Sequence, residues 1–537
     1  MRWRSGFAAA VGILFLAFLS HPAAPRPREA SRSIPPSQLG QVTFPTSCTA
    51  DAQSTIVNGV ALLHSFQYME ASGTFSDAVK QDPQCAMAHW GKAMSLYHQL
   101  WDFPQPKTLN EGREEIQQAQ KLTAATDRER AYIAAAAAFY QDNPKLSHAE
   151  RTQAYSASLA KLHAQSPQDP EASEFYALSL IALAAVEQID EMSNRRAAIA
   201  ILEPILQQQP DSPGAAHYLI HATDVPELAP QGLTAARRYA KIAPDSSHAI
   251  HMPSHIFARL GLWQESIASN LAAVSAATHE AEMHHSEAHY QTHAMDYLDY
   301  AYLQTGQESK ARQVAAAELN VVGSDDEEKA NHQTIVLARN ALELHHWKEA
   351  AALPIPAIRE VWLDTAYYTR AIGAARSGDL SAAREAIEKL KKCVVEREAH
   401  QRKEGYPVSA EKATDLAEAE SWLAFAQGKT EEALTEMRAA TARQEKERLE
   451  NAGMPAREML ADMLLEAERP ADALAEYKID LTNSPNRFDA LLGAAHAAQA
   501  LGNSDAAREY YSKLAEISAP GADRAELAEA KIYLAKK

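Results

Sequence analysis

The chain has 537 residues, which is more than a single hydrophobic core usually accommodates, so we expect an elongated array or several units. Its 52 Lys and Arg residues against 70 Asp and Glu residues give a net charge of −18, which repels phosphate backbones and therefore predicts no nucleic-acid partner. Ala, Leu, Glu, Gln and Arg dominate while β-branched residues are sparse, which predicts an all-α fold.

The N-terminus has the features of a secretory signal. Arg2 and Arg4 precede an apolar run from residue 7 to 19, which is too short to span a bilayer comfortably. Residues 1–24 are therefore predicted to be a signal peptide of an exported protein, periplasmic or secreted. Because residues 20–25 lack a clean small-x-small cleavage site, an uncleaved anchor is the alternative. No membrane span is expected after the signal.

Residues 25–47 contain several prolines with Ser and Arg and no apolar period, which predicts a disordered linker. Folding is expected to begin near Cys48. The chain has only Cys48, Cys85 and Cys393, too few for a disulfide framework, although an oxidising compartment permits one bridge. We expect it to join Cys48 and Cys85, because these two cysteines flank a single repeat.

That repeat places small residues where two antiparallel helices touch, an aromatic residue between them and a proline at the end, namely Asn58, Gly59, Ala71, Phe75, Ala78 and Pro83. A second unit begins at Ala86, which indicates a repeat period of roughly 34 residues. Helix, glycine turn and Ala-rich helix recur around Gly378, Gly428 and Gly502. From residue 51 onwards the chain resembles the tetratricopeptide-repeat (TPR) family, and its N-terminus suggests a bacterial-type exported member.

The resemblance implies a right-handed superhelical solenoid of antiparallel helix pairs, with a concave groove for a protein or peptide partner. We expect residues 48–320 to form an N-terminal superhelix with a histidine-lined concave face. Residues 321–537 are expected to form a C-terminal array of ordinary repeats.

Histidines recur at the repeat period. His217 and His221 lie one helical turn apart, as do His251 and His255, and the second pair follows the first by one full period. One more period leads to His285 and His289. In the TPR family these positions line the groove. Pro253 leaves the geometry of the second pair open, because a helix beginning there would put His251 at its cap.

The third unit is longer than the others. The separation of Gly261 from Gly306 exceeds one period by about 11 residues, which add about three helical turns. Because whole turns are added, the lengthened helix would still direct the same face toward the groove. That face would carry one stripe of side chains, namely His285, His289, His293, Asp296 and Tyr300. His64 and His98, which are also one period apart, and Trp101 are expected to line the same interior.

Neutral imidazoles with a nearby carboxylate suit zinc, copper or iron. The candidate metal ligands are His217, His221, His251, His255, His285, His289, His293 and Asp296, and Asp224 and Glu287 are further acidic candidates. Two alternatives stay open: the histidines hold a peptide in the groove, or they result from duplication of one histidine-containing repeat.

The sequence contains no GxxxxGK[ST], GxGxxG, GxSxG, HExxH or CxxCH motif. We therefore expect an exported TPR scaffold for protein–protein interaction, with a polyhistidine metal site in its N-terminal half. The alternative is a metal-dependent enzyme or a metal-handling protein that uses the histidine cluster, so enzymatic activity is left open.

Overall fold

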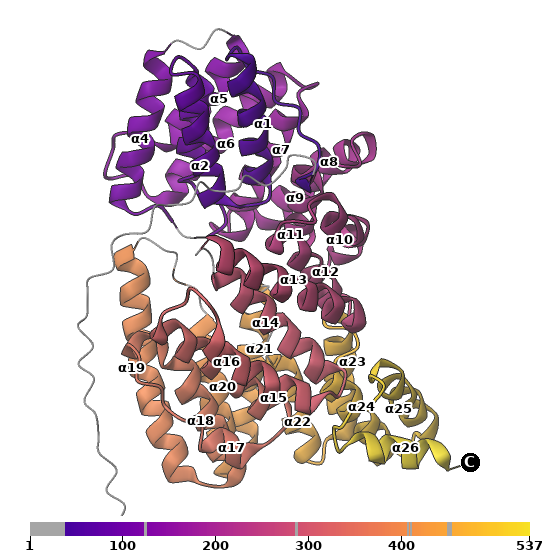
Figure 1. The fold of residues 1–537 in the computed structure, drawn as a ribbon. Helices are drawn as coiled ribbons and strands as arrows, with labels where there is room; N and C mark the ends of the chain where they lie inside the picture. Colours follow the sequence, from indigo (N-terminus) through magenta and orange to yellow (C-terminus); the bar gives the residue numbers. More distant parts are fainter. Residues whose placement is uncertain are drawn as a thin grey trace, which may run out of the picture. The chain divides into compact units, whose positions relative to one another are not determined.

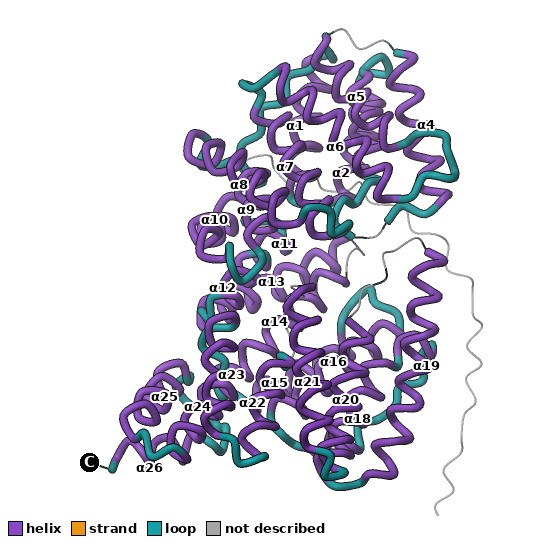
Figure 2. The backbone as a smooth tube through the Cα atoms, turned by 180° about the vertical axis from the view of Figure 1, so that it is seen from behind, coloured by secondary structure: helices purple, strands orange, loops and turns teal. Residues whose placement is uncertain are grey.

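The computed structural model describes residues 38–101, 103–122, 126–284, 288–404, 408, 411–447 and 454–536. All regular elements within these ranges are helices, and Figure 2 shows no strand among the described residues. The prediction of an all-α fold is confirmed. The predicted signal peptide lies outside the described residues.

The N-terminal helices follow one another in antiparallel pairs with short connections (Figure 1). They are α1 (Ala50–His64), α2 (Tyr68–Gln81), α3 (Ala86–Met94), α4 (Pro106–Lys121), α5 (Asp127–Phe139), α6 (His148–Gln165), α7 (Pro170–Ala185), α8 (Glu191–Gln208), α9 (Pro213–Thr223) and α10 (Ala229–Ile242). Several begin at strong caps: Thr126 with Glu129, and Ser147 with Glu150, form complete capping boxes.

The middle of the chain contains two short helices, two long ones, a further helix and a 3₁₀ turn. These elements are α11 (Ser247–His251), α12 (Pro253–Arg259), α13 (Trp263–His284), α14 (Ala288–Gln304), α15 (Glu308–Ala317) and the 3₁₀ turn η2 (Glu318–Asn320). The additional residues between Gly261 and Gly306 are thus distributed over α13 and α14, which pack against each other, rather than extending a single helix.

The C-terminal part continues the helix pairs. Its elements are α16 (Asp326–Glu343), α17 (Trp347–Ala351), η3 (Glu360–Trp362), α18 (Asp364–Ser377), α19 (Leu380–Glu404), α20 (Glu411–Ala426), α21 (Thr430–Glu447), α22 (Ala456–Glu466), α23 (Pro470–Asn483), α24 (Phe488–Ala500), α25 (Ser504–Ile517) and α26 (Leu527–Ala535). Gly378, Gly428 and Gly502 have positive φ angles of 86°, 78° and 72°, so each supplies the left-handed residue that a tight helix–helix turn requires. The right-handed path of the array stays a prediction.

The first repeat is held together by an aromatic ring between two glycines. Phe75 of α2 is fully buried, and a Cβ atom at Gly59 of α1 would lie 2.7 Å from its ring. A Cβ atom at Gly91 of α3 would come closer still. Only glycine allows the three helices to approach this ring so closely.

The predicted disordered linker is wrong for its described part, residues 38–47. Leu39 and Phe44 are buried, and the ring of Phe44 stacks on Trp90 with centroids 5.3 Å apart. The Gln41 N–H donates to the carbonyl of Asp211 at 2.8 Å. Two apolar side chains and paired backbone groups are enough to attach this proline-rich segment to the helices.

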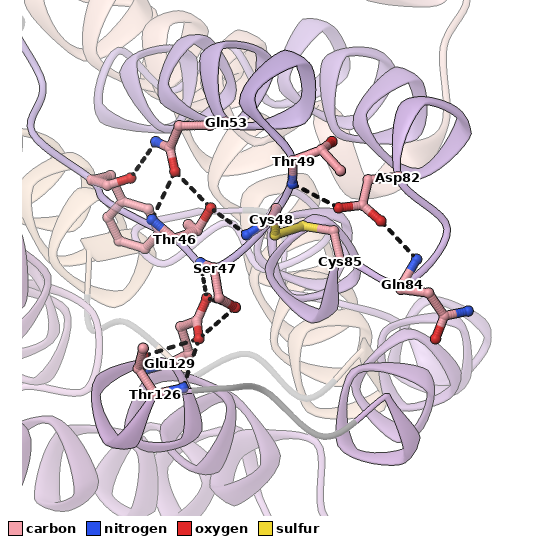
Figure 3. Close-up of a disulfide and its surroundings, with 11 residues drawn as sticks. Thr46, Ser47, Cys48, Thr49, Gln53, Asp82, Gln84, Cys85, Thr126 and Glu129 are labelled. Atoms are coloured by element: carbon pink, nitrogen blue, oxygen red, sulfur yellow. Dashed lines mark hydrogen bonds between the residues drawn. A yellow bond between two sulfur atoms is a disulfide. The ribbon is translucent and has the colours of Figure 1, made fainter.

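The segment that follows is fixed by a buried carboxylate and a disulfide (Figure 3). Ser47 donates from its backbone N–H to Glu129 Oε1 at 2.7 Å, and its hydroxyl contacts the same carboxylate. Cys48 and Cys85 are joined by a disulfide across 37 residues. Cys393 is buried in α19.

The chain does not divide at residue 320 as predicted. A hydrophobic cluster containing α13 to α16 runs from Trp263 to Leu344, so the predicted boundary falls inside a core. Contacts also reach across the sequence: Trp263 Nε1 donates to the carbonyl of Asn486 at 2.7 Å, and α14 packs on α24. The described residues from 38 to 536 belong to one compact unit. None of the helices in the described ranges has both the length and the apolar character to cross a bilayer.

We predict that Gly91→Ala lowers the free energy of unfolding by about 1–3 kcal/mol, because the methyl group would overlap the Phe75 ring. The matched control is Gly73→Ala in α2, where a Cβ atom meets nothing within 4 Å. There alanine should be neutral or stabilise the helix by up to about 1 kcal/mol. Urea unfolding of both variants measures the difference, and equal shifts would contradict the packing described for Phe75.

Candidate metal centre

Three histidines meet at the junction of α9 and α11. His217 and His221 lie one turn apart on α9, whose start is capped by the Ser212 hydroxyl. The Nε2 atom of His217 lies 3.1 Å from Nε2 of His221 and 3.1 Å from Nε2 of His248 on α11. We call His217, His221 and His248 the first triad.

The tautomer of His217 is determined by its other nitrogen. Nδ1–H donates to the backbone carbonyl of His64 at 2.6 Å, so Nε2 of the neutral ring presents a lone pair to the other two histidines. The ring is fully buried and stacks on Tyr239, with centroids 4.9 Å apart. This is the arrangement in which metal-binding histidines are usually found.

A second set of histidines follows immediately along the chain. His251 ends α11, His255 lies in α12 and His293 comes from α14. Nε2 of His255 lies 3.0 Å from Nε2 of His251 and 3.3 Å from Nε2 of His293. We call His251, His255 and His293 the second triad.

In the second triad, His251 of α11 and His255 of α12 are each held by a hydrogen bond from Nδ1. His251 Nδ1–H donates to Asn270 Oδ1 at 2.7 Å, and the Asn270 amide is oriented because its Nδ2 donates to the Ser266 carbonyl. His255 Nδ1–H donates to Asp224 Oδ2 at 2.9 Å. Arg259 holds the other oxygen of Asp224 at 2.8 Å.

The consequence is an unusual pair of facing acceptors. With Nδ1–H committed to Asn270 and to Asp224, the neutral rings of His251 and His255 direct lone pairs at each other across 3.0 Å. Two lone pairs repel at this distance unless a positive charge lies between them.

His251 is a poor carrier of that charge, whereas a second proton on His255, beside the Asp224 carboxylate, would supply it. Burial, followed by the charges of His293 and His255, holds the pKa of His251 well below its ordinary value. In the first triad, burial lowers the pKa of His217 to about 3, and the pKa values of His221 and His248 are also held well below the ordinary value. Burial would raise the pKa of Asp224, but Arg259 and His255 hold it well below its usual range.

Pro253 does not disrupt the second pair. Met252 has φ −50° and ψ −35°, so the chain passes from α11 to α12 in helical conformation, and Pro253 occupies the first turn of α12. The side chains of His251 and His255 therefore point to the same side, one helical turn apart, as do those of His217 and His221.

The predicted stripe on α14 is only partly brought together. His293 joins the second triad, whereas His289 is exposed and stacks on the His293 ring at 5.8 Å. Asp296 pairs with Arg339 at 2.5 Å rather than with a histidine. Tyr300 is buried, and its hydroxyl accepts from Arg487 at 2.8 Å. His285 and Glu287 lie outside the described residues.

The residues expected to line an open groove instead pack between helices. His64 is fully buried and hydrogen-bonds Glu171 at 2.7 Å. His98 stacks on Tyr68 at 4.1 Å, and Trp101 lies 5.8 Å from His248. The expectation of a histidine-lined concave face is not met at His217, whose side chain is fully buried.

Sequence reasoning missed His248. His248 lies three residues before His251, so helical spacing places it near the second pair. The other histidines were identified because they recur one repeat period apart, and His248 has no such counterpart. Asn270 carries no signal in the sequence, because its role depends on how α13 packs on α11.

A third cluster, His64 with Glu171 and Glu174, supports the first triad. Burial, followed by the charge of Glu171, raises the pKa of Glu174 to about 8, and its Oε1 accepts from the Ser212 hydroxyl at 2.5 Å. Tyr218 contacts His64 Nδ1 at 2.8 Å. Because these groups already have partners in one another, we interpret this cluster as a network that holds His64, whose carbonyl orients His217.

No family model and no curated protein matches the chain. Among solved structures, a monomeric mutant of IFIT1 with Gppp-AAAA is 14% identical with a TM-score of 0.37, and the match covers 88% of this chain and 96% of that one. The P58(IPK) TPR domain is 14% identical with a TM-score of 0.21, covering 91% and 100%. Likenesses this weak say nothing about what this chain binds.

We predict that the metal-free protein loses stability as the pH falls below about 6.5. The unfolded histidines take up protons there while the buried ones stay neutral, so the unfolded state binds more protons and is favoured, by up to about 1.4 kcal/mol per pH unit for each such histidine. Thermal unfolding midpoints at pH 7, 6 and 5 in the presence of a chelator measure this.

The His217→Ala variant should show a shallower decline than the wild type, because one buried titrating group is gone. His279→Ala, at an exposed position of α13, should leave the slope unchanged. Parallel profiles for the wild type and His217→Ala would contradict the prediction.

Proposed function

We propose that this chain is a helical-repeat metalloprotein that binds two divalent transition-metal ions, one at the first triad and one at the second. The observation that carries the proposal is the pair of facing Nε2 lone pairs of His251 and His255, whose Nδ1 atoms are both committed to acceptors. A metal ion is the natural occupant between them, since it accepts both lone pairs at once.

The distances agree with shared coordination. Imidazole nitrogens about 2.0–2.1 Å from one ion lie about 2.9–3.4 Å apart for angles between 90° and tetrahedral. Four of the six Nε2–Nε2 separations in the two triads are 3.0, 3.1, 3.1 and 3.3 Å, and all ligand atoms of a triad lie within 4.8 Å of one another. The side chains therefore need little movement to bind an ion.

The surroundings of the triads also favour a metal. A carboxylate that orients a histidine is a common second shell, and Asp224 occupies this position behind His255. Hydrogen bonds between neutral imidazoles are the competing interpretation, and they suffice for His221 and His248, whose tautomers are not constrained by Nδ1 partners in the same way. Between His251 and His255 they require a second proton on His255, which the neighbouring Asp224 carboxylate would stabilise.

Three imidazoles suit zinc, copper or iron. Three protein ligands leave a further coordination position, which is characteristic of catalytic rather than structural zinc sites. We therefore favour metal-dependent catalysis or metal handling over a purely structural ion.

Binding of a protein or peptide partner is the second candidate function. The observation that favours it is the regular series of helix, glycine turn and helix from α18 to α25, the pattern on which the resemblance to TPR proteins rests. The two functions are compatible, because the triads lie on α9, α11, α12 and α14, none of which belongs to these pairs.

We further propose that the protein is exported. Arg2 and Arg4 with the apolar run of residues 7–19 support this, and so does the Cys48–Cys85 disulfide, because such bonds persist mainly in oxidising compartments.

We predict about two equivalents of zinc, copper or iron per chain in untagged protein purified from its native source. His248→Ala and His293→Ala should each lose about one equivalent, because each removes a ligand from one triad, and the double variant should lose both. Elemental analysis of the purified proteins measures this.

The control is His279→Ala, which removes an exposed histidine outside both triads and should keep the full metal content. Absence of metal from the wild type, with no difference in stability among the variants after incubation with zinc, copper or iron, would exclude the proposed sites and leave the partner-binding scaffold.

For export, we predict that the mature protein lacks residues 1–24 and is recovered outside the cytoplasm. Mass spectrometry of the N-terminal peptide from fractionated cells measures this. A full-length N-terminus in the cytoplasmic fraction would contradict export.

A further inference from the structure

A large cavity adjoins the second triad. It has a volume of about 590 Å³, which lies in the range of small-molecule sites, and it is bordered by α14, α16, α18 and α20. His293 lines this cavity and is at the same time a member of the second triad. Tyr297, whose hydroxyl lies 3.2 Å from His255 Nδ1, also lines it.

One wall of the cavity is apolar and aromatic. Ile335 and Leu342 of α16 contribute aliphatic surface, and Tyr297 and Tyr368 contribute rings. Such a wall accommodates the body of an organic molecule, and aromatic faces also attract cations.

Another part of the lining, on α20, is acidic. Glu411, Asp415 and Glu418 follow one another at helical spacing along α20, so they share one face of that helix. The whole lining has five acidic side chains, with Asp296 and Glu343 included, against two basic ones, Arg339 and Lys412.

Both basic side chains are already engaged. Lys412 lies within 3.3 Å of Asp364, Glu411 and Asp415. Arg339 binds Asp296 and Asp299. The acidic groups are also crowded: burial, followed by the charge of Asp415, raises the pKa of Glu418 to about 8. A positively charged occupant would relieve this crowding, whereas an anion would increase it.

We infer that this cavity is the ligand chamber of the second triad, and that it binds a small organic cation, an apolar body with a protonated amine, beside the metal ion. The amine lies toward Glu418 and the apolar body lies against Tyr297 and Leu342. The position beside the metal rests on the proposed function; the selection of a cation does not.

The cation is tested first on metal-free protein. Calorimetry compares phenethylamine with 3-phenylpropionate, which has a similar body and the opposite charge. We expect phenethylamine to bind about tenfold more tightly or better. Glu418→Gln should remove most of this preference while keeping the hydrogen bond of Tyr368 to residue 418.

Two variants complete this arm. Glu420→Gln, on the same helix but outside the cavity lining, should bind phenethylamine like the wild type. Thr365→Trp should weaken both ligands, because its indole would occupy the cavity from α18. Equal affinities for the two ligands, or an unchanged preference in Glu418→Gln, would overturn the assignment of a cation.

The link to the metal is tested on protein loaded with cobalt(II). Azide should change the visible spectrum of the wild type and of His248→Ala, which retains the second triad beside the cavity, and should change that of His293→Ala, which retains only the buried first triad, much less. Phenethylamine should weaken azide binding because it fills the adjoining chamber.

If cobalt is retained and phenethylamine has no effect on azide binding, the chamber does not serve the metal. If no cobalt is retained, the proposed function fails, and calorimetry still decides whether the chamber selects cations.

Discussion

The geometry of the histidine centre depends on the hydrogen bonds made by the nitrogens that face away from it. An imidazole has two nitrogens, and an acceptor at Nδ1 determines that Nε2 carries a lone pair. A backbone carbonyl does this for His217, an amide for His251 and a carboxylate for His255. Each acceptor comes from a different element, so the direction of these lone pairs reflects how α1, α13 and the segment after α9 pack around α11 and α12.

The rest of the chain holds these elements in place. His64 contributes its carbonyl from the end of α1, and its ring is held by Glu171 and Tyr218, which lie on α7 and α9. On the other side, α14 brings His293 to the second triad. Two turns further along α14, Tyr300 accepts from Arg487, whose guanidinium also binds Glu343 and Glu458 in a fully buried network. A C-terminal segment thus helps to position a helix of the site.

The helix-pair architecture explains why a buried site can form in a fold that usually presents an open groove. Two successive repeats each supply a histidine pair. The pair on α9 and the pair formed by His251 of α11 and His255 of α12 are brought together because α9 and α12 pack. The longer helices α13 and α14 then cover α11, supplying Asn270 and His293. The added length therefore encloses histidines that an ordinary repeat would leave accessible.

The sequence alone was sufficient to predict the all-α fold, the helix pairs, the glycine turns and the two histidine pairs, because each depends on local spacing along the chain. It also placed His293 beside them. It did not reveal His248, the anchoring acceptors or the cavity, and it wrongly predicted disorder for residues 38–47 and a boundary at residue 320. These features depend on contacts between residues far apart in sequence, such as Asp211 with Gln41 and Asn270 with His251. Spacing determines which face of a helix a side chain occupies, whereas the tertiary structure decides what lies opposite that face.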